Sequence, residues 1–217
     1  MVVLAGLFML TLPSFASDRS DDVLRIQAST RAFHEIMATP DKGIPKELLE
    51  TARCVAIIPG EKKAAFVFGA NYGKGIATCR TEKGWSAPMF LTVAGGSFGF
   101  QIGGSSTDVV LLFMNDHALQ SLLSDKFKIG GDVTVAAGPV GRQASANTDL
   151  KFNAEILSYS RSKGIFAGIS ADGTVVEADK SGDQAMYGQD VNRYMILHGN
   201  LAVPAEATRL VRQLDRQ

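Results

Sequence analysis

Apolar and polar residues alternate along this chain with two different periods, and the change falls close to Cys54. Before it, apolar residues recur three, four or seven positions apart, as they do on one face of a helix. These positions are Val23, Ile26, Phe33 and Met37. We expect an amphipathic helix over Ser20–Ala38, because its serine suits the N-cap and a proline lies just beyond its end. A second, short helix is predicted over Ile44–Ala52.

From Cys54 onward, short apolar runs are separated by glycine or turn residues, which is typical of strands. The runs are CVAIIP, AAFVFG, GIATCR, APMFLTVAGG, SFGFQIGG and TDVVLLFM. Later strands are predicted at Lys126–Ile129, Asp132–Ala137, Thr174–Ala178 and as a pair around Ser158–Lys163. Later helices are predicted at Asp116–Leu123, near Asp190–His198, and from Pro204 with Leu210 and Leu214. This order predicts an α+β fold, with a curved antiparallel sheet or partial barrel flanked by N- and C-terminal helices.

Length and charge exclude some classes of function. A chain of 217 residues with 46% hydrophobic content suits one sizeable core, and we expect one domain. Lysine and arginine together number 22, as do aspartate and glutamate, so no global field favours nucleic acid. Nucleic-acid binding is therefore not expected, and an anionic ligand would need a local cluster of cations.

The first residues, MVVLAGLFMLTLPSFAS, carry no charge and end in a small-x-small pattern suited to signal peptidase. We expect a cleaved signal peptide over residues 1–16 and a mature domain over 17–217, located in the periplasm or secreted. The alternative is an ordinary hydrophobic terminus, because no basic residue precedes the apolar run. Thr11 and Pro13 break that run, which is shorter than the ~20 residues of a spanning helix.

The two cysteines, Cys54 and Cys79, leave two alternatives open. In an oxidising compartment they could form a disulfide that closes a loop of about 25 residues. They could equally be two buried free thiols, since both lie in predicted strands and the strand order decides whether they meet.

Motifs that would indicate an enzyme lack their structural context. Ser97 lies in a G-x-S-x-G match, but alternating, glycine-rich residues follow it where a helix should begin. The segment Gly69–Lys74 is one residue too short for a phosphate loop. His34, His117 and His198 show no ligand spacing with one another or with the cysteines. We therefore expect no enzyme activity, no metal and no cofactor.

Cations near the glycine-rich turns are the main candidate chemistry. They are Lys62, Lys63, Lys74, Lys126, Lys128, Arg142, Arg161 and Lys163. If several converge on one face, they could hold a phosphate or an anionic lipid headgroup. The alternative is a solvated rim, which is the usual role of such charges.

Long blocks of the sequence resemble the SYLF domain family. They include ARCVAIIP, KKAAFVFGANYGKGIATCR, GWSAPMFLTVAGGSFGFQIGGSSTDVVLLFMN, GGDVTVAAGPVGR, AEILSYSRSKGIFAGIS, MYG and ILHGN. Together they extend from about Arg53 to Leu214, and their order makes the resemblance specific. Cys54 and Cys79 look like a pair seen in a bacterial subgroup, which favours the disulfide. Asp183 stands where the family often has Asn.

The resemblance implies a non-enzymatic module that binds membrane lipid, with phosphoinositide binding in eukaryotic members and actin binding in some. For an exported protein it implies an anionic phospholipid or membrane surface as the partner, with actin only by analogy. The alternative function, from another class, is a structural or interaction protein of the envelope that binds another protein through its glycine-rich sheet. The residues expected to bind lipid are Lys74, Lys126, Lys128, Arg142, Tyr159, Arg161 and Lys163. In the block Ser158–Lys163 we expect a hairpin or strand end whose cations face the partner, while Tyr159 packs or anchors at the interface.

Overall fold

The computed structural model describes residues 19–38, 43–60, 72–95, 107–140, 154–162, 165–168 and 171–217. Several predictions lie outside these residues: the signal peptide over 1–16, the strands AAFVFG and SFGFQIGG, Ser97, Lys62, Lys63, Arg142 and Lys163. No helix in the described part of the chain is long and apolar enough to cross a membrane.

The N-terminal helices agree with the spacing of apolar residues. Helix α1 spans Arg19–Met37 and helix α2 spans Lys46–Thr51. The predicted apolar stripe of α1 packs on the sheet, with Ile26 and Phe33 fully buried. The apolar stripe of α1 is therefore covered by the sheet.

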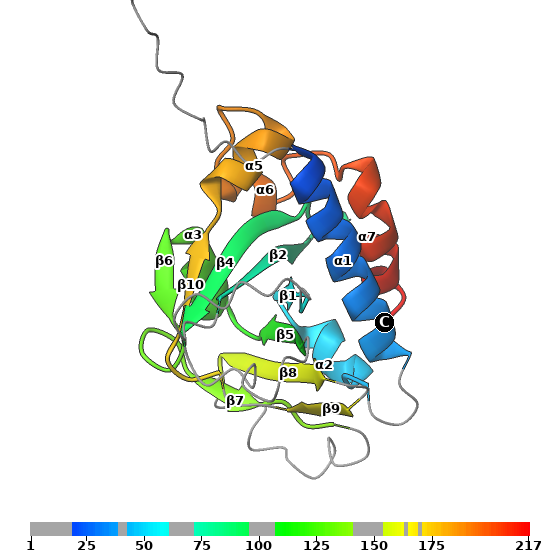
Figure 1. The fold of residues 1–217 in the computed structure, drawn as a ribbon, viewed down its shortest axis with the longest axis vertical. Helices are drawn as coiled ribbons and strands as arrows, with labels where there is room; N and C mark the ends of the chain where they lie inside the picture. Colours follow the sequence, from blue (N-terminus) through cyan, green and yellow to red (C-terminus); the bar gives the residue numbers. More distant parts are fainter. Residues whose placement is uncertain are drawn as a thin grey trace, which may run out of the picture.

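The strands form one curved sheet in the order β6-β10-β4-β2-β1-β5-β8-β7, with β3 paired to β2 and β9 paired to β8 (Figure 1). Their bounds are β1 Cys54–Ile58, β2 Tyr72–Thr81, β3 Gly84–Trp85, β4 Met89–Gly95, β5 Thr107–Phe113, β6 Lys126–Lys128, β7 Val135–Ala137, β8 Ile156–Ser162, β9 Ile165–Gly168 and β10 Thr174–Ala178. Every named pairing is antiparallel except β7 with β8, which is parallel. The α+β prediction with a curved sheet and flanking helices is confirmed.

Alternation along the central strands places a hydrophobic core on each face of the sheet. In β1, Ala56 and Ile58 belong to one core, while Val55 and Ile57 belong to the other. Helices α1, α2 and α7 (Thr208–Asp215) cover the second core. Helices α3 (Asp116–Leu123) and α6 (Arg193–Leu197) contribute buried side chains to the first. With both faces covered, the central strands read as continuous apolar runs.

The C-terminal half contains one helix that the sequence pattern did not predict, α5 at Lys180–Tyr187. A glycine within it lowers helix propensity, which conceals the helix from pattern reasoning. The helix is held by its N-cap Asp179, whose side chain accepts from the backbone N of Gly182. A Cβ at Gly182 would lie 3.1 Å from the side chain of Phe90, so this glycine lets α5 pack closely on β4.

Three other boundaries differ from prediction. Helix α6 begins at Arg193 with Asn192 as its N-cap, and a short 3-10 helix, η2 at Ala205–Ala207, precedes α7. Strand β7 occupies only the end of the predicted strand Asp132–Ala137, because the preceding residues form a turn. Their backbone amides form hydrogen bonds within the turn; for example, Asp132 N donates to Lys128 O at 2.8 Å.

Cys54 and Cys79 form a disulfide and are directly opposed on β1 and β2. The backbone N of Arg80 donates to Arg53 O, so the adjacent cysteine pair occupies a position without its own cross-strand hydrogen bonds. Side chains approach most closely at such positions. The strand order therefore decides between the two alternatives in favour of the bridge.

Candidate functional site

Two of the predicted lysines lie in one row across the sheet, although they are far apart in the sequence. Lys74 pairs with Thr92, Thr92 pairs with Glu177, and Glu177 pairs with Lys126. Directly paired residues point to the same side of a sheet. The row therefore runs over β2, β4, β10 and β6 on one face.

A second row lies beside the first and adds an aromatic residue. It consists of Tyr72, Ala94, Val175 and Lys128, each paired with the next. We call Tyr72, Lys74, Lys126 and Lys128 the lysine face. Tyr72 is 58% exposed and was not among the residues predicted to contact a ligand. The available signal was its alternation with Lys74 in YGKGIATC, which places both on the same side of the strand.

The charges of the lysine face are only partly neutralised by neighbours. Lys126 Nζ lies 3.7 Å from Glu177 Oε2, and both side chains are more than half exposed, so this pair contributes little to stability. Lys74 and Lys128 are exposed and form no ion pair with any acid in the described ranges. Two positive charges are therefore available to a ligand.

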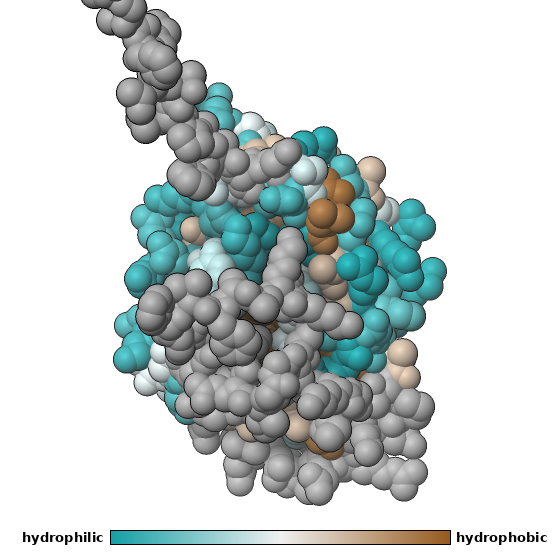
Figure 2. Space-filling view, viewed as in Figure 1, coloured by the Kyte–Doolittle hydropathy of each residue, from teal (hydrophilic) through white to brown (hydrophobic). Residues whose placement is uncertain are grey.

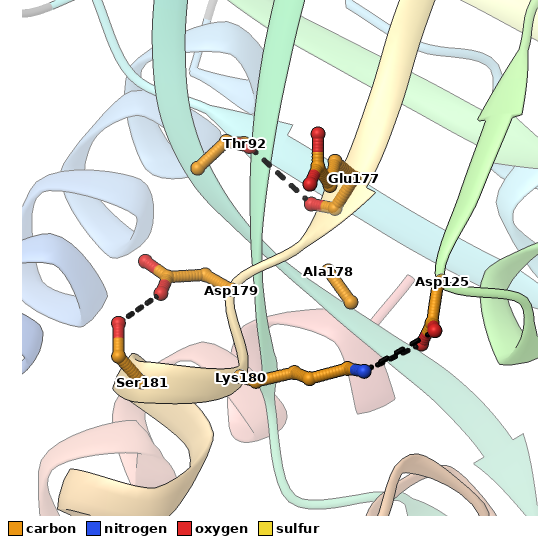
Figure 3. A pocket seen from close by; sticks show the side chains of 7 residues that line it. All are labelled: Thr92, Asp125, Glu177, Ala178, Asp179, Lys180 and Ser181. Atoms are coloured by element: carbon orange, nitrogen blue, oxygen red, sulfur yellow. Dashed lines mark hydrogen bonds and ion pairs between the residues drawn. The ribbon is translucent and has the colours of Figure 1, made fainter.

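An open pocket of about 410 Å³ adjoins the lysine face where β10 leads into α5 (Figure 3). Its lining residues are Thr92, Asp125, Glu177, Ala178, Asp179, Lys180 and Ser181. Lys180 Nζ lies 3.1 Å from Asp125 Oδ1, and Arg193 also pairs with this carboxylate. Hydrogen bonds from Lys180 and Arg193 hold the pKa of Asp125 below its usual range. The pocket's acids are thus already engaged with basic residues of the chain.

Tyr72 lies close enough to the pocket for the charges there to change its pKa. Partial burial raises the pKa of Tyr72, and the negative charges of Asp179 and Glu177 raise it further against the opposing effect of Arg25. The phenol therefore stays neutral at physiological pH. A neutral, exposed tyrosine beside lysines suits the boundary between water and a lipid layer.

A buried ionic cluster lies between α1, α5 and β4. Arg25 pairs with Asp22 at 3.2 Å and with Asp179 at 2.8 Å, and its guanidinium lies 5.1 Å from the centre of the Phe90 ring. Asp183 is 3% exposed and accepts a hydrogen bond from Phe90 N. Burial raises the pKa of Asp183 to about 7, with further contributions from the charges of Asp179 and Asp22.

Arg161 lies on β8 and is held by two acids. Its Nη2 lies 2.6 Å from Asp108 Oδ2, its Nε donates to the same oxygen at 3.2 Å, and it also pairs with Glu35 of α1. Burial disfavours the charged guanidinium, but Asp108 and Glu35 outweigh this and raise the pKa of Arg161. In this structure Arg161 joins α1 to the sheet, and a direct contact with lipid would require it to leave these partners.

Tyr159 is fully buried, so of the two predicted roles the structure shows packing and not an interface anchor. Its ring occupies the space beside Gly138, where an added Cβ would lie 2.1 Å from the ring. The neighbouring residues of the motif also form strand, because β8 and β9 pair antiparallel with Ser162 opposite Ile165. The strand pair expected around this motif is confirmed, while Lys163 lies outside the described residues.

The described residues contain no group of three or more acids, histidines or cysteines placed to hold a metal ion. His117 Nδ1 lies 2.5 Å from Glu155 Oε1, and the same carboxylate accepts from Thr134 N at 2.8 Å. This histidine therefore helps to connect α3 with the segments before β7 and β8.

Comparison with known proteins identifies the family. A family model described as "Ysc84: Las17-binding protein actin regulator" matches residues 94–217. SH3 domain-containing YSC84-like protein 1 of Bos taurus and that of Homo sapiens are each 36% identical over 189 residues, or 85% of this chain. The chain belongs to the Ysc84 family. Protein YSC84 of Saccharomyces cerevisiae is similar too, with 35% identity over 179 residues, or 81% of this chain.

The chain spans about half the length of the vertebrate Ysc84 relatives and less of the yeast protein. The matched region is 55% of the bovine and human proteins and 38% of yeast YSC84. Shared sequence therefore concerns this domain and not the remainder of those proteins.

The Ysc84 family model covers only part of the lysine face. Lys126, Lys128, the pocket acids and β8 fall within residues 94–217, whereas Tyr72 and Lys74 precede them. The longer match to the vertebrate relatives covers most of the chain.

Proposed function

We propose that this Ysc84-family domain binds anionic phospholipid at a membrane surface through the lysine face, and that it acts by binding and not by catalysis. The observation that carries the proposal is the register that brings Lys74, Lys126 and Lys128 onto one face. Each lysine near an anionic membrane contributes about 1 kcal/mol. The membership of a family with lipid-binding roles supports the same conclusion.

Within this proposal the predicted residues take different roles. Lys74 and Lys128 make the main electrostatic contacts because no described acid neutralises them. Tyr72, in place of Tyr159, lies at the water–lipid boundary. Arg161 acts as a positioning residue that holds α1, and Arg142 and Lys163 are proposed as additional contacts on the basis of sequence. Export to the periplasm or cell exterior remains part of the proposal.

Co-sedimentation with vesicles tests this function. The full chain is mixed with phosphatidylcholine vesicles and with vesicles that also contain phosphatidylglycerol, at low and moderate salt. We expect salt-sensitive binding to the anionic vesicles alone, because screening weakens exposed charge pairs. Absence of binding to both would overturn the proposal and favour a protein partner on the glycine-rich sheet.

Paired lysine variants localise the binding. Lys74→Gln with Lys128→Gln should weaken binding by roughly 30-fold, the equivalent of about 2 kcal/mol. The matched control is Lys46→Gln with Lys83→Gln, which removes two exposed lysines from α2 and the β2–β3 turn. Equal effects of the two pairs would show that overall charge, and not the lysine face, controls binding.

A further inference from the structure

Helix α7 carries a stripe of arginines on the side away from the core. Leu210 and Leu214 are buried, whereas Arg209, Arg212 and Arg216 are exposed. With 3.6 residues per turn, the three arginines lie within about 60° of one another around the axis, roughly opposite the leucines. Arg216 is the C-cap residue and keeps right-handed helical backbone angles.

Part of this arrangement lowers helix stability, although Arg212 lies in the last turn, where the helix dipole favours a cation. Arg209 and Arg212 are three residues apart, and Arg212 and Arg216 are four apart, so both pairs place like charges side by side. Arg209 also lies in the first turn, where the helix dipole disfavours a cation. A helix face whose only role is contact with solvent does not require these destabilising interactions.

The acids nearest to the stripe in sequence are directed elsewhere. Glu206 pairs with Arg19 of α1 at 3.4 Å. Asp215 Oδ1 lies by the β2–β3 turn, 3.4 Å from the position of a Cβ at Gly84. In the part of the chain that the structure describes, no acid forms an ion pair with Arg209, Arg212 or Arg216.

The stripe is also separate from the lysine face. Helix α7 packs against β3, which pairs with Arg80 and Thr81 at the far end of β2. Lys74 lies near the start of β2, about 20 Å along the strand from Arg80. In Figure 1 α7 and β6 lie on opposite sides of the molecule, and in Figure 2 the edge formed by α7 is mainly hydrophilic.

We propose that Arg209, Arg212 and Arg216 form a docking surface for an acidic polypeptide segment. The stripe is about 10 Å long, and its guanidinium groups are spaced as carboxylates are when they recur every three or four residues on a helix. Arginine binds carboxylates through paired, parallel hydrogen bonds, which suits it to such a partner. The surface leaves the lysine face free, so one domain can hold an acidic protein and a membrane together.

Fluorescence anisotropy with a labelled hexaglutamate peptide tests this surface in the full chain. Replacing all three arginines with Gln should weaken peptide binding at least tenfold and reduce its salt dependence. The Arg→Lys triple variant keeps the charge, and its affinity for the peptide should lie between those of the original protein and the Gln variant, because lysine cannot form the paired hydrogen bonds. The control variant, Lys74→Gln with Lys128→Gln, should bind the peptide as the original protein does.

Two further measurements distinguish loss of the binding surface from misfolding of the variant protein. The Gln triple variant should unfold at about the same temperature as the original protein, since the like-charge pairs that it removes offset the favourable dipole interaction of Arg212. Amide exchange should slow over residues 208–216 when peptide is added. Unchanged peptide binding by the Gln variant would overturn the inference, as would loss of anionic-vesicle binding with peptide binding retained. Unchanged peptide binding would leave the lysine-face proposal untouched, whereas loss of vesicle binding would assign part of the membrane contact to α7.

Discussion

Arg25 and Asp179 form a buried ion pair, with Nη1 2.8 Å from Oδ2 and side chains only 3% and 9% exposed. The pair joins the first helix of the described structure to the N-cap of α5, more than 150 positions later in the chain. Hydrogen bonds from Ser181, Arg25 and Gly182 outweigh the effect of burial and hold the pKa of Asp179 below its usual range. The Asp179 carboxylate therefore stays ionised at neutral pH.

Arg25→Met should lower the free energy of unfolding by about 3–5 kcal/mol, because it leaves buried carboxylates without their cation. Methionine is chosen to keep most of the side-chain volume. Urea unfolding followed by circular dichroism measures the change. Arg31→Met, on the exposed side of the same helix, is the control and should change stability little. Similar losses of unfolding free energy in both variants would show that the ion pair makes no specific contribution to stability.

Asp183→Asn should stabilise the protein increasingly as pH rises. The folded-state pKa of about 7 lies above the unfolded value near 4, so the folded state binds the proton more tightly. Asp183 therefore carries no penalty below about pH 4, and its penalty grows until pH exceeds 7. Asparagine can still accept from Phe90 N without a charge.

Urea unfolding at pH 5 and pH 8 checks this prediction. The gain from Asp183→Asn should be larger at pH 8, on the order of 2–4 kcal/mol. Asp190→Asn, at an exposed position, serves as the control. A gain that is equal at both pH values would contradict the assignment of a raised pKa to Asp183.

Gly138→Ala should destabilise the fold by about 1–3 kcal/mol, because the new Cβ would overlap the buried ring of Tyr159. Thermal unfolding measures the loss. Gly131→Ala is the matched control, since its Cβ would meet only the flexible side chain of Lys128 at 3.4 Å. In a Tyr159→Leu background the cost of Gly138→Ala should shrink, and an unchanged cost would locate the strain elsewhere.

Replacing both Cys54 and Cys79 with Ala should lower the free energy of unfolding by about 3 kcal/mol, because the bridge restricts the unfolded chain. Mass spectrometry after alkylation in denaturant provides the direct check. We expect no labelled thiol without reductant and two after reduction. Labelling of both cysteines without reductant would show that the bridge is absent.

The sequence by itself determined the local structure of most elements. Apolar spacing is sufficient to place α1 and the central strands, because a helix face and a strand face are properties of neighbouring residues. The sequence places the N-cap of α3 at Asn115 or Asp116, and in the structure Asn115 takes it, accepting a hydrogen bond from Ala118 N. Alternation also determines that Lys74 points to the same side of its strand as Tyr72.

Only the tertiary structure decided which strands are neighbours, and with this which side chains meet. The order of β2, β4, β10 and β6 brings Lys74 and Lys126 into one row and Cys54 opposite Cys79. For the same reason only the structure decides that Tyr159 packs and that Tyr72 is exposed, since β8 is covered at Tyr159 whereas β2 is open at Tyr72. Pairing between distant strands depends on the packing of the whole chain, and local periodicity contains no record of it.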